Sequence, residues 1–258
     1  MDRSRRRKYG QNFLNNASII KKIALDIPVK QGDRILEIGP GHGALTYVYL
    51  SKDIGVTAVE IDEECVEVLE EQYEGKDLKV IHSDFLKLTD EDILNTKCDW
   101  IVGNLPYYAA TGILLKLLPL LHNFKGAMFM TQLEPALRIC ANPGTKSYGY
   151  LTVAVKQYAK TSLLREIGPD NFTPRPKVDS ATFMVEPLPI EEQAPKELLE
   201  FAEVAFMQKR KTLSNNLSKK YEKEAIKLVL EELDLDLRIR AEQVDIPTLI
   251  KMMLLLEK

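Results

Sequence analysis

Three short apolar runs in the first third of the chain each end in residues that can bind a small ligand. The first leads into the glycine-rich segment Glu37–Gly43, the second ends in Glu60, and the third is followed by Asp84. Glycines between a strand and a helix let the backbone approach a ligand beside the helix N-terminus. Because parallel strands present their carboxyl ends at one edge of a sheet, Gly39, Glu60 and Asp84 are expected to meet there.

These residue types suit a nucleoside. Glu60 can accept hydrogen bonds from two ribose hydroxyls, Asp84 can accept one from an adenine amine, and the adjacent Phe85 can cover the ring. The spacing Gly39-x-Gly41-x-x-Ala44 also satisfies the loose dinucleotide pattern of a nicotinamide dehydrogenase, and Glu60 fits either reading. A nucleoside site is therefore predicted, and the cofactor has to be decided by another motif.

That motif is Asn104-Leu105-Pro106-Tyr107, directly after a fourth β-rich run. The exocyclic amine of adenine or cytosine is a poor nucleophile because its lone pair is delocalised into the ring. The side-chain oxygen of Asn104 and the carbonyl of Leu105 can hold both amine hydrogens and turn the lone pair toward a methyl donor. Pro106 stiffens the turn, and Tyr107 offers a ring on which a base can stack. The motif predicts methyl transfer to a base, since no hydride-handling acid or base is found on the later strands.

The elements that must position these residues alternate between strand and helix from about Asp33 to Pro187. Such alternation predicts an α/β fold with right-handed βαβ units and a Rossmann-like parallel sheet covered on both faces. The predicted strands are Arg34–Ile38, Val56–Glu60, Leu78–Ile81, Asp99–Val102 and Lys125–Met130, with Ser180–Val185 as a late antiparallel strand. The predicted helices are Ala17–Ile27, Ala44–Lys52, Asp62–Tyr73 and Ala109–Leu121.

The composition changes after Glu186, where three prolines break the chain and helical patterns follow. We therefore expect a catalytic, cofactor-binding domain over residues 1–186, which contains the motifs above, and a small all-helical domain over 187–258. The helices expected in the second domain are Glu197–Phe206, Glu224–Leu233 and Pro247–Leu256.

The charge of the chain is unevenly distributed. The formal net charge is −3, yet two basic clusters stand out: Arg5, Arg6, Arg7 and Lys8 near the start, and Lys209, Arg210 and Lys211 in the helical part. A basic cluster is often only a solvated face. Two of them in a chain that is acidic elsewhere predict a surface that binds phosphates.

Composition excludes several classes of protein. With 258 residues, 45% hydrophobic and 28% charged, the chain is neither a disordered polymer nor a collagen-like fibre. No apolar run is long enough for a membrane helix, and the basic N-terminus is no secretory signal. Cys65, Cys98 and Cys140 lie far apart without metal-ligand spacing. We expect reduced thiols, no metal, no membrane partner and a cytoplasmic location.

Nearly the whole chain resembles the small-subunit ribosomal RNA adenine dimethyltransferases of the KsgA type. The resemblance rests on ordered motifs: Gly10–Leu14, Glu37–Gly43, Glu60, Asp84, Asn104–Tyr107, Tyr148-Gly149 with Leu151, Phe172–Ser180, Gln208–Leu217 and Arg240–Glu242. It implies an enzyme that places two methyl groups on each of two adjacent adenosines in the 3′-terminal hairpin of small-subunit ribosomal RNA, by direct displacement and without a general base. The implied partners are that RNA and the small-subunit precursor, and the implied state is a monomer.

The resemblance also implies roles for individual residues. Asn12 and Leu14 would close over the methionine end of S-adenosylmethionine, which Gly39 touches from below. Glu60 would hold the ribose and Asp84 the adenine. Asn104 would bind the target amine, with Tyr107 and Phe172 stacked on the flipped-out base.

One segment departs from the family pattern. Leu133 stands where the family usually has Lys, and Pro135 is tolerable only in the first turn of a helix. Two alternatives stay open at this point: a large-subunit ribosomal RNA methyltransferase of the macrolide-resistance type, and a non-catalytic assembly or transcription factor on the same fold. The latter predicts erosion of Asn104, Tyr107 or Glu60, and none of the three is eroded.

Overall fold

The computed structural model describes residues 11–106 and 108–257. The chain divides into two compact units, one made of residues 1–136 and 160–187 and the other of 137–159 and 188–258. The second boundary falls at Pro187, next to the expected one. The insertion of Leu137–Ala159 into the second unit was not expected, because these residues stand between predicted parts of the sheet domain.

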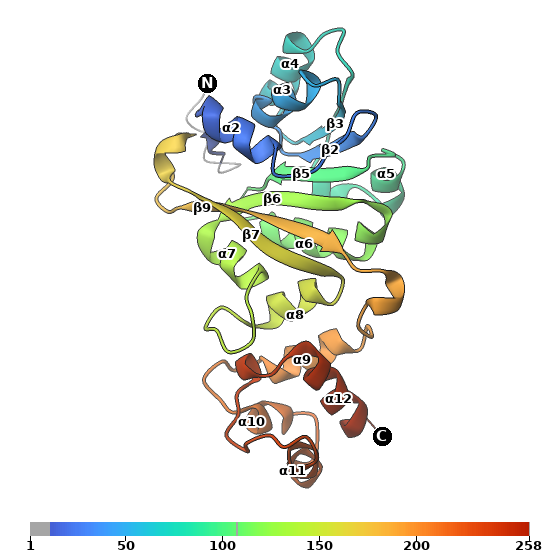
Figure 1. The fold of residues 1–258 in the computed structure, drawn as a ribbon, viewed down its shortest axis with the longest axis vertical. Helices are drawn as coiled ribbons and strands as arrows, with labels where there is room; N and C mark the ends of the chain where they lie inside the picture. The colour runs from blue at the N-terminus through green and yellow to red at the C-terminus, as the bar shows by residue number, and fades with distance from the viewer. Residues whose placement is uncertain (1–10, 107, 258) are drawn as a thin grey trace. The chain divides into compact units, whose positions relative to one another are not determined.

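The first unit is built on a mixed sheet whose described strands follow the order β4-β3-β2-β5-β6-β9-β7 (Figure 1). Neighbours from β4 to β6 pair in parallel, and β9 pairs antiparallel with β6, as predicted. The strands are β2 (Arg34–Ile38), β3 (Gly55–Glu60), β4 (Leu78–His82), β5 (Trp100–Asn104), β6 (Gly126–Gln132), β7 (Ala159–Ile167) and β9 (Ser180–Pro187). Strand β7 was missed because its alternation of apolar and polar residues is weak.

Helices and a short ladder complete the first unit. The helices and 3₁₀ turns are α2 (Ala17–Ala24), α3 (Ala44–Leu50), α4 (Glu63–Gln72), η1 (Phe85–Lys87), α5 (Asp90–Leu94), α6 (Ala110–Leu117), η2 (Leu118–Asn123) and η3 (Pro169–Asn171). A separate two-stranded ladder joins β1 (Phe13–Leu14) to β8 (Phe172–Thr173). This ladder fixes the segment before α2 beside the sheet.

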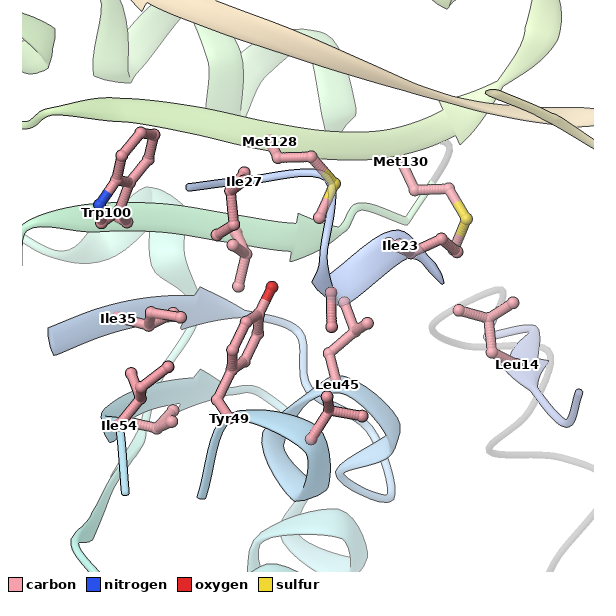
Figure 2. Packing of buried hydrophobic residues seen from close by; sticks show 14 of the residues in the cluster. Leu14, Ile23, Ile27, Ile35, Leu45, Tyr49, Ile54, Trp100, Met128 and Met130 are labelled. Atoms are coloured by element: carbon pink, nitrogen blue, oxygen red, sulfur yellow. The ribbon is translucent and has the colours of Figure 1, made fainter. Parts of the chain in front are cut away.

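The central strands are buried on both faces, which suits their β-branched and apolar sequences. Figure 2 shows the core on the α2 and α3 side, where Tyr49 of α3 projects among Ile27, Ile35 and Met128. The hydroxyl of Tyr49 is buried without a hydrogen-bond partner among the described residues. Packing against the sheet therefore holds α3, whose N-terminus meets the glycine-rich loop.

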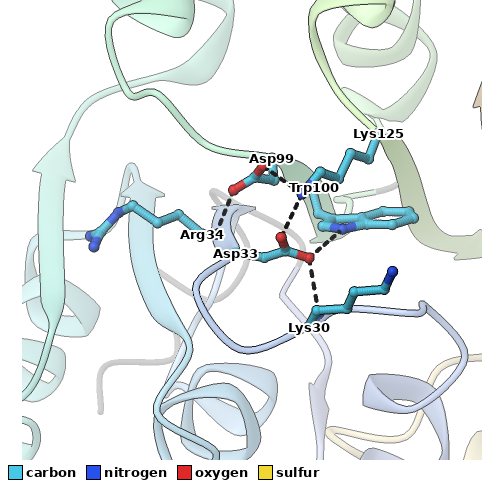
Figure 3. A network of polar contacts seen from close by, with 6 residues as sticks. All are labelled: Lys30, Asp33, Arg34, Asp99, Trp100 and Lys125. Carbon is cyan, nitrogen blue, oxygen red and sulfur yellow. Dashed lines mark hydrogen bonds and ion pairs between the residues drawn. The ribbon is translucent and has the colours of Figure 1, made fainter.

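The amino ends of the strands are tied together by a polar network (Figure 3). The Lys125 ammonium pairs with Asp33 and, at 2.8 Å, with Asp99, while the Trp100 indole donates to Asp33 at 3.2 Å. Burial alone would raise the pKa of Asp33. Hydrogen bonds from Lys125, the Lys30 backbone and Trp100 outweigh it and hold this pKa below its usual value. The network joins the starts of β2, β5 and β6.

The second unit has its own core, in which residues from Ala141 to Val153 pack with the C-terminal helices. Its elements are α8 (Tyr150–Lys156), η4 (Ile190–Glu192), α9 (Leu198–Ala205), α10 (Leu213–Leu217), α11 (Lys223–Glu232), η5 (Ala241–Gln243) and α12 (Ile246–Leu256). The C-terminal part is helical, as predicted. Helix α7 (Leu133–Ile139) spans the boundary between the units, and Pro135 lies in its first turn, the position that tolerates proline.

Candidate active site

A cleft in the first unit opens at the carboxyl ends of β2, β3, β4 and β5 and encloses about 1130 Å³, open mouth included. It brings together most of the residues that the sequence singled out for the cofactor and the base. Its lining includes Asn12, Leu14, Glu37, Gly39, Glu60, Asp84, Phe85, Asn104, Leu105 and Pro106.

Glu60 is the most constrained acceptor in the cleft. Its side chain is 3% exposed and accepts hydrogen bonds from three backbone N–H groups, those of Gly41 (3.0 Å), Ile61 (2.9 Å) and Asp62 (3.0 Å). Burial raises the pKa of Glu60, and the three hydrogen bonds oppose this shift. The carboxylate is thus oriented before any ligand arrives, as a preorganised acceptor requires.

The glycine-rich loop depends on backbone conformations that glycine permits. Gly39 and Gly41 have φ of +64° and +58°, in the left-handed region. A Cβ on Gly39 would lie 3.6 Å from the Asn104 carbonyl and fill the gap between the two loops. A Cβ on Gly41 would lie 2.7 Å from the ring of Phe13. Phe13 in turn stacks on His42, with ring centroids 4.2 Å apart, so the N-terminal segment covers this loop closely.

Glu37, the last polar residue of β2, is a second buried carboxyl at this edge. Burial raises its pKa to about 7, with a further contribution from the charge of Glu60, while hydrogen bonds from Thr46 oppose the shift. The Thr46 hydroxyl donates to Glu37 Oε2 at 2.6 Å. The contact ties β2 to the first turn of α3, immediately behind the glycine-rich loop.

Asp84 and Phe85 follow β4. One oxygen of Asp84 accepts the Leu86 N–H at 3.0 Å and caps η1, and Asp84 also lines the cleft. Phe85 is 4% exposed, so its ring is fixed in place. A charged acceptor beside a fixed aromatic ring suits a planar heterocycle with an amine.

Asn104, the last residue of β5, lines the cleft together with the loop that follows it. The Asn104 amide nitrogen donates to the Asn12 carbonyl at 3.2 Å, and this orients its side-chain oxygen to accept from another donor. The Leu105 N–H donates to Met130 of β6 at 2.9 Å, and the Pro106 carbonyl accepts from Ala109 and Ala110 at the start of α6. Tyr107 lies outside the described residues. The loop is therefore held by strand β6, by the segment before β1 and by the start of the helix that follows.

Phe172 differs from its expected place. It pairs with Leu14 in the β1–β8 ladder, is 4% exposed and belongs to the buried core, and it is not among the residues that line the cleft. The described contacts therefore give Phe172 a packing role in this conformation. Its stacking on a target base stays a prediction of the family resemblance.

The basic residues fall into two groups. Arg5, Arg6, Arg7 and Lys8 lie outside the described residues. Lys209, Arg210 and Lys211 are exposed in the second unit, in the turn before α10. The Lys209 ammonium donates to the Lys146 carbonyl, and Asn216 donates to Ala205 and Gln208 at 2.7 and 3.2 Å, so the turn is anchored at both sides.

Sequence reasoning missed some of the residues that shape the cleft. Phe13, His42 and Tyr108 line it together with apolar residues such as Ile113. The only signal for Phe13 was its position within the motif Gly10–Leu14, and its contact with Gly41 depends on long-range folding. Tyr108 follows the catalytic motif directly, which is a signal that the sequence did contain.

A parallel sheet with a glycine-rich turn, two successive strand-end carboxylates and an Asn-Leu-Pro loop at one edge defines the class of S-adenosylmethionine-dependent methyltransferases. A family model described as ribosomal RNA adenine dimethylase matches residues 2–258, and the chain belongs to that family. Membership in this class implies S-adenosylmethionine as the methyl donor.

Two curated relatives carry the name "Ribosomal RNA small subunit methyltransferase A". The protein of Prosthecochloris aestuarii is 38% identical over 222 residues, covering 84% of this chain and 83% of the relative. The protein of Mycoplasma mobile is 37% identical over 247 residues, covering 95% and 96%. The similarity thus extends over both units.

Solved structures agree on the fold. A dimethyladenosine transferase from Plasmodium falciparum matches with a TM-score of 0.79 and 28% identity, over 94% of this chain and 96% of the other. The 23S rRNA methyltransferase ErmE matches with a TM-score of 0.73 over 96% and 100%, at 24% identity, which shows the shared fold alone.

Two features are absent from the described residues. No described helix is long and apolar enough to cross a membrane. Within the same residues, no cluster of three or more His, Cys, Asp or Glu side chains is arranged to hold a metal ion.

Proposed function

We propose that this chain transfers methyl groups from S-adenosylmethionine to the exocyclic amines of two adjacent adenosines in the 3′-terminal hairpin of small-subunit ribosomal RNA. The observation that carries the proposal is the orientation of Asn104. Its amide nitrogen is engaged by Asn12, and its oxygen is left to accept from an amine in the cleft. The shared family and the names of the relatives supply the RNA.

The residues at the strand ends fit the cofactor. Gly39 has no side chain, and this leaves a gap toward Asn104 that a Cβ would fill. The gap suits the methionine end of the cofactor, which Asn12 and Leu14 of the cleft lining would cover. Glu60 would accept from the ribose hydroxyls, and Asp84 from the adenine amine, with Phe85 against the ring. When bound, S-adenosylmethionine supplies a methyl group activated by its sulfonium.

On the other side of the cleft, the loop would hold the target base. Asn104 Oδ1 and the Leu105 carbonyl would accept the two amine hydrogens and so turn the lone pair out of the plane of the ring. Pro106 keeps the loop rigid, and Tyr107 remains the proposed stacking ring. Holding both partners in line is the main contribution of such a site, so we propose neither a general base nor a metal.

The RNA would contact both parts of the chain. We propose that residues 1–186 carry catalysis and 187–258 recognise RNA, with Arg5, Arg6, Arg7, Lys8, Lys209, Arg210 and Lys211 meeting phosphates. The proposal includes a monomer that acts in the cytoplasm on the precursor of the small subunit, in ribosome biogenesis.

The test is methyl transfer from radiolabelled S-adenosylmethionine to separated ribosomal subunits that lack the modification, followed by mapping of the labelled nucleotides. We expect label in small-subunit RNA alone. Label in large-subunit RNA would favour the macrolide-resistance type of activity, and the absence of any label would favour a non-catalytic assembly factor.

A further inference from the structure

An exposed apolar patch lies at the mouth of the cleft, outside the residues that the proposed chemistry uses. We call it the Tyr108 patch and define it by Leu86 of η1 together with Tyr108, Gly112 and Leu115 on and before α6. Tyr108 is 66% exposed, Leu86 41% and Leu115 36%. Large apolar side chains gathered at one place on a surface mark an interaction site more often than single ones do.

The patch is continuous with the active site. Tyr108 lines the cleft and follows the Asn104–Tyr107 loop directly in the chain. Gly112 and Leu115 come next on the exposed side of α6, and a Cβ on Gly112 would lie 3.6 Å from Leu86. A ligand that leaves the cleft past Tyr108 therefore meets this patch first.

Glycine is an unusual residue at position 112, which lies inside helix α6. Gly112 is exposed, and glycine in a helix interior is less favourable than alanine. The 3.6 Å contact of a Cβ with Leu86 is an ordinary van der Waals distance, so packing does not demand glycine here. The glycine leaves bare backbone between Tyr108 and Leu115, where a flat group can approach closely.

Two cations border the patch. The Lys116 ammonium donates to the Leu86 carbonyl at 3.3 Å, which holds it at the edge of the patch, and Lys87 is exposed next to Leu86. No carboxylate among the described residues forms an ion pair with either lysine. An aromatic ring on a surface that cations border is the combination that binds single-stranded nucleic acid, because bases stack on the ring and the cations neutralise phosphate.

We propose that the Tyr108 patch binds the nucleotide next to the target adenosine, its base stacked on Tyr108 and its phosphate near Lys116 or Lys87. This inference rests on the proposed function, because it requires an RNA strand whose base enters the cleft. When one of two adjacent adenosines is flipped into the cleft, the other stands one nucleotide away with an unstacked face. The patch covers that face while its neighbour is methylated.

The first experiment measures the dissociation constant of a labelled hairpin RNA that carries the two adjacent adenosines. Tyr108→Ala is expected to weaken binding about 5–150-fold, the range for loss of one base–aromatic stack. Tyr108→Phe, which keeps the ring, is expected to restore most of the affinity. Tyr47→Ala is the matched control, because Tyr47 is 62% exposed and does not line the cleft. RNA affinity that is equal for Tyr108→Ala and the control would overturn the proposal.

A second experiment identifies what stacks on the ring. The same hairpin is made with an abasic site at the nucleotide next to the target. The wild-type protein is expected to lose affinity for this RNA, and Tyr108→Ala to lose little more, since the two changes remove the same contact. If the fold-losses in affinity from the abasic site and from Tyr108→Ala multiply when the two changes are combined, Tyr108 binds something else and the proposal is overturned.

Calorimetry with S-adenosylmethionine separates the inference from the function on which it rests. If Tyr108→Ala weakens cofactor binding as much as RNA binding, the ring belongs to the cofactor site and the inference fails. If the wild-type enzyme methylates small-subunit RNA but the substitutions leave RNA binding unchanged, only the inference fails. If the wild-type enzyme does not methylate that RNA, the proposed function fails first.

Discussion

The two ends of the parallel strands carry the same residue types in opposite electrostatic states. At the amino ends, Asp33 and Asp99 pair with the Lys125 ammonium, and the pKa of Asp33 is held below its usual value. At the carboxyl ends, burial raises the pKa of Glu37 and of Glu60. No cation among the described residues pairs with either of these glutamates.

This difference separates the carboxylates that stabilise the fold from those that remain as acceptors for a ligand. Carboxylates that are paired within the protein contribute to folding and have little left to offer a ligand. Carboxylates held only by N–H and hydroxyl donors stay oriented and uncompensated, which suits ligand donors such as ribose hydroxyls. Substitutions at the carboxyl ends of the strands should therefore affect chemistry and ligand binding. Substitutions at the amino ends should affect the stability of the fold.

The largest effect is expected at Asn104. Asn104→Ala should lower kcat by about 10²-fold or more, because it removes a preorganised acceptor of the reacting amine. The affinity for RNA should change little, since phosphate contacts carry most of it. Single-turnover kinetics at saturating RNA, with a separate binding titration, measure the two quantities. A loss confined to RNA affinity would place Asn104 outside the chemistry.

Glu60→Ala should weaken S-adenosylmethionine binding by about 1.5–3 kcal/mol, because hydrogen bonds to a charged acceptor are lost. Calorimetry on the free enzyme measures this. Asp62→Ala is a useful neighbour for comparison: Asp62 caps α4 through the Glu64 N–H and does not line the cleft. Unchanged affinity in Glu60→Ala would mean that the ribose is held elsewhere.

At the amino end, Asp33→Asn should reduce the free energy of unfolding by about 1–3 kcal/mol, because the Lys125 and Trp100 donors lose a charged acceptor. Asp77→Asn is the matched control: it removes the exposed Arg34–Asp77 pair and should cost less than about 1 kcal/mol. Chemical denaturation of both variants checks this. If Asp33→Asn lowered kcat and left the free energy of unfolding unchanged, Asp33 would serve the chemistry and not the fold.

The same carboxyl sets a pH dependence. The folded-state pKa of Asp33 lies below its usual value of 3.8, so its stabilisation is complete above that pH and is lost as pH falls through the folded-state pKa. The difference in unfolding free energy between wild type and Asp33→Asn should therefore shrink below about pH 4. Denaturation curves across acid pH measure it, and a difference that grows with acid would reverse the sign assigned here.

The smallest effect is expected from the basic turn of the second unit. Replacing Lys209, Arg210 and Lys211 together by Ala should reduce the slope of log affinity for RNA against log salt by about 2, at roughly 0.7–0.9 per phosphate contact. The contact of Lys209 with the Lys146 carbonyl leaves its remaining N–H donors for phosphate. The control replaces Lys196, Lys223 and Lys227, three exposed lysines of the same unit, and should keep the slope. Equal slopes in the two triple variants would mean that the cluster only solvates the turn.

The sequence predicted the parts of the fold and site that depend on local pattern. Strand β2 has the predicted bounds, β9 is antiparallel as expected, and Gly39, Glu60, Asp84 and Asn104 meet at one edge of the sheet. Regular alternation and strand-end position are properties of short segments, so they can be read without the rest of the chain.

Long-range pairing was harder to predict. Leu137–Ala159 joins the C-terminal core through contacts such as the Gly144 N–H with the Glu242 carbonyl at 2.7 Å, which no local pattern reveals. The same holds for the β1–β8 ladder, which buries Phe172 against Leu14. The sequence shows which residue types are present. Which of their side chains face the cleft depends on contacts between segments that are far apart in the chain.

The proposed dimethylation of two adjacent adenosines is tested by identifying the modified nucleotides in the product RNA. Small-subunit RNA from particles that lack the modification is incubated with the enzyme and S-adenosylmethionine, digested, and its 3′-terminal fragment analysed by mass spectrometry. We expect a single fragment that contains two adjacent N6,N6-dimethyladenosines. A fragment without added methyl groups, or methylation confined to another RNA, would contradict it.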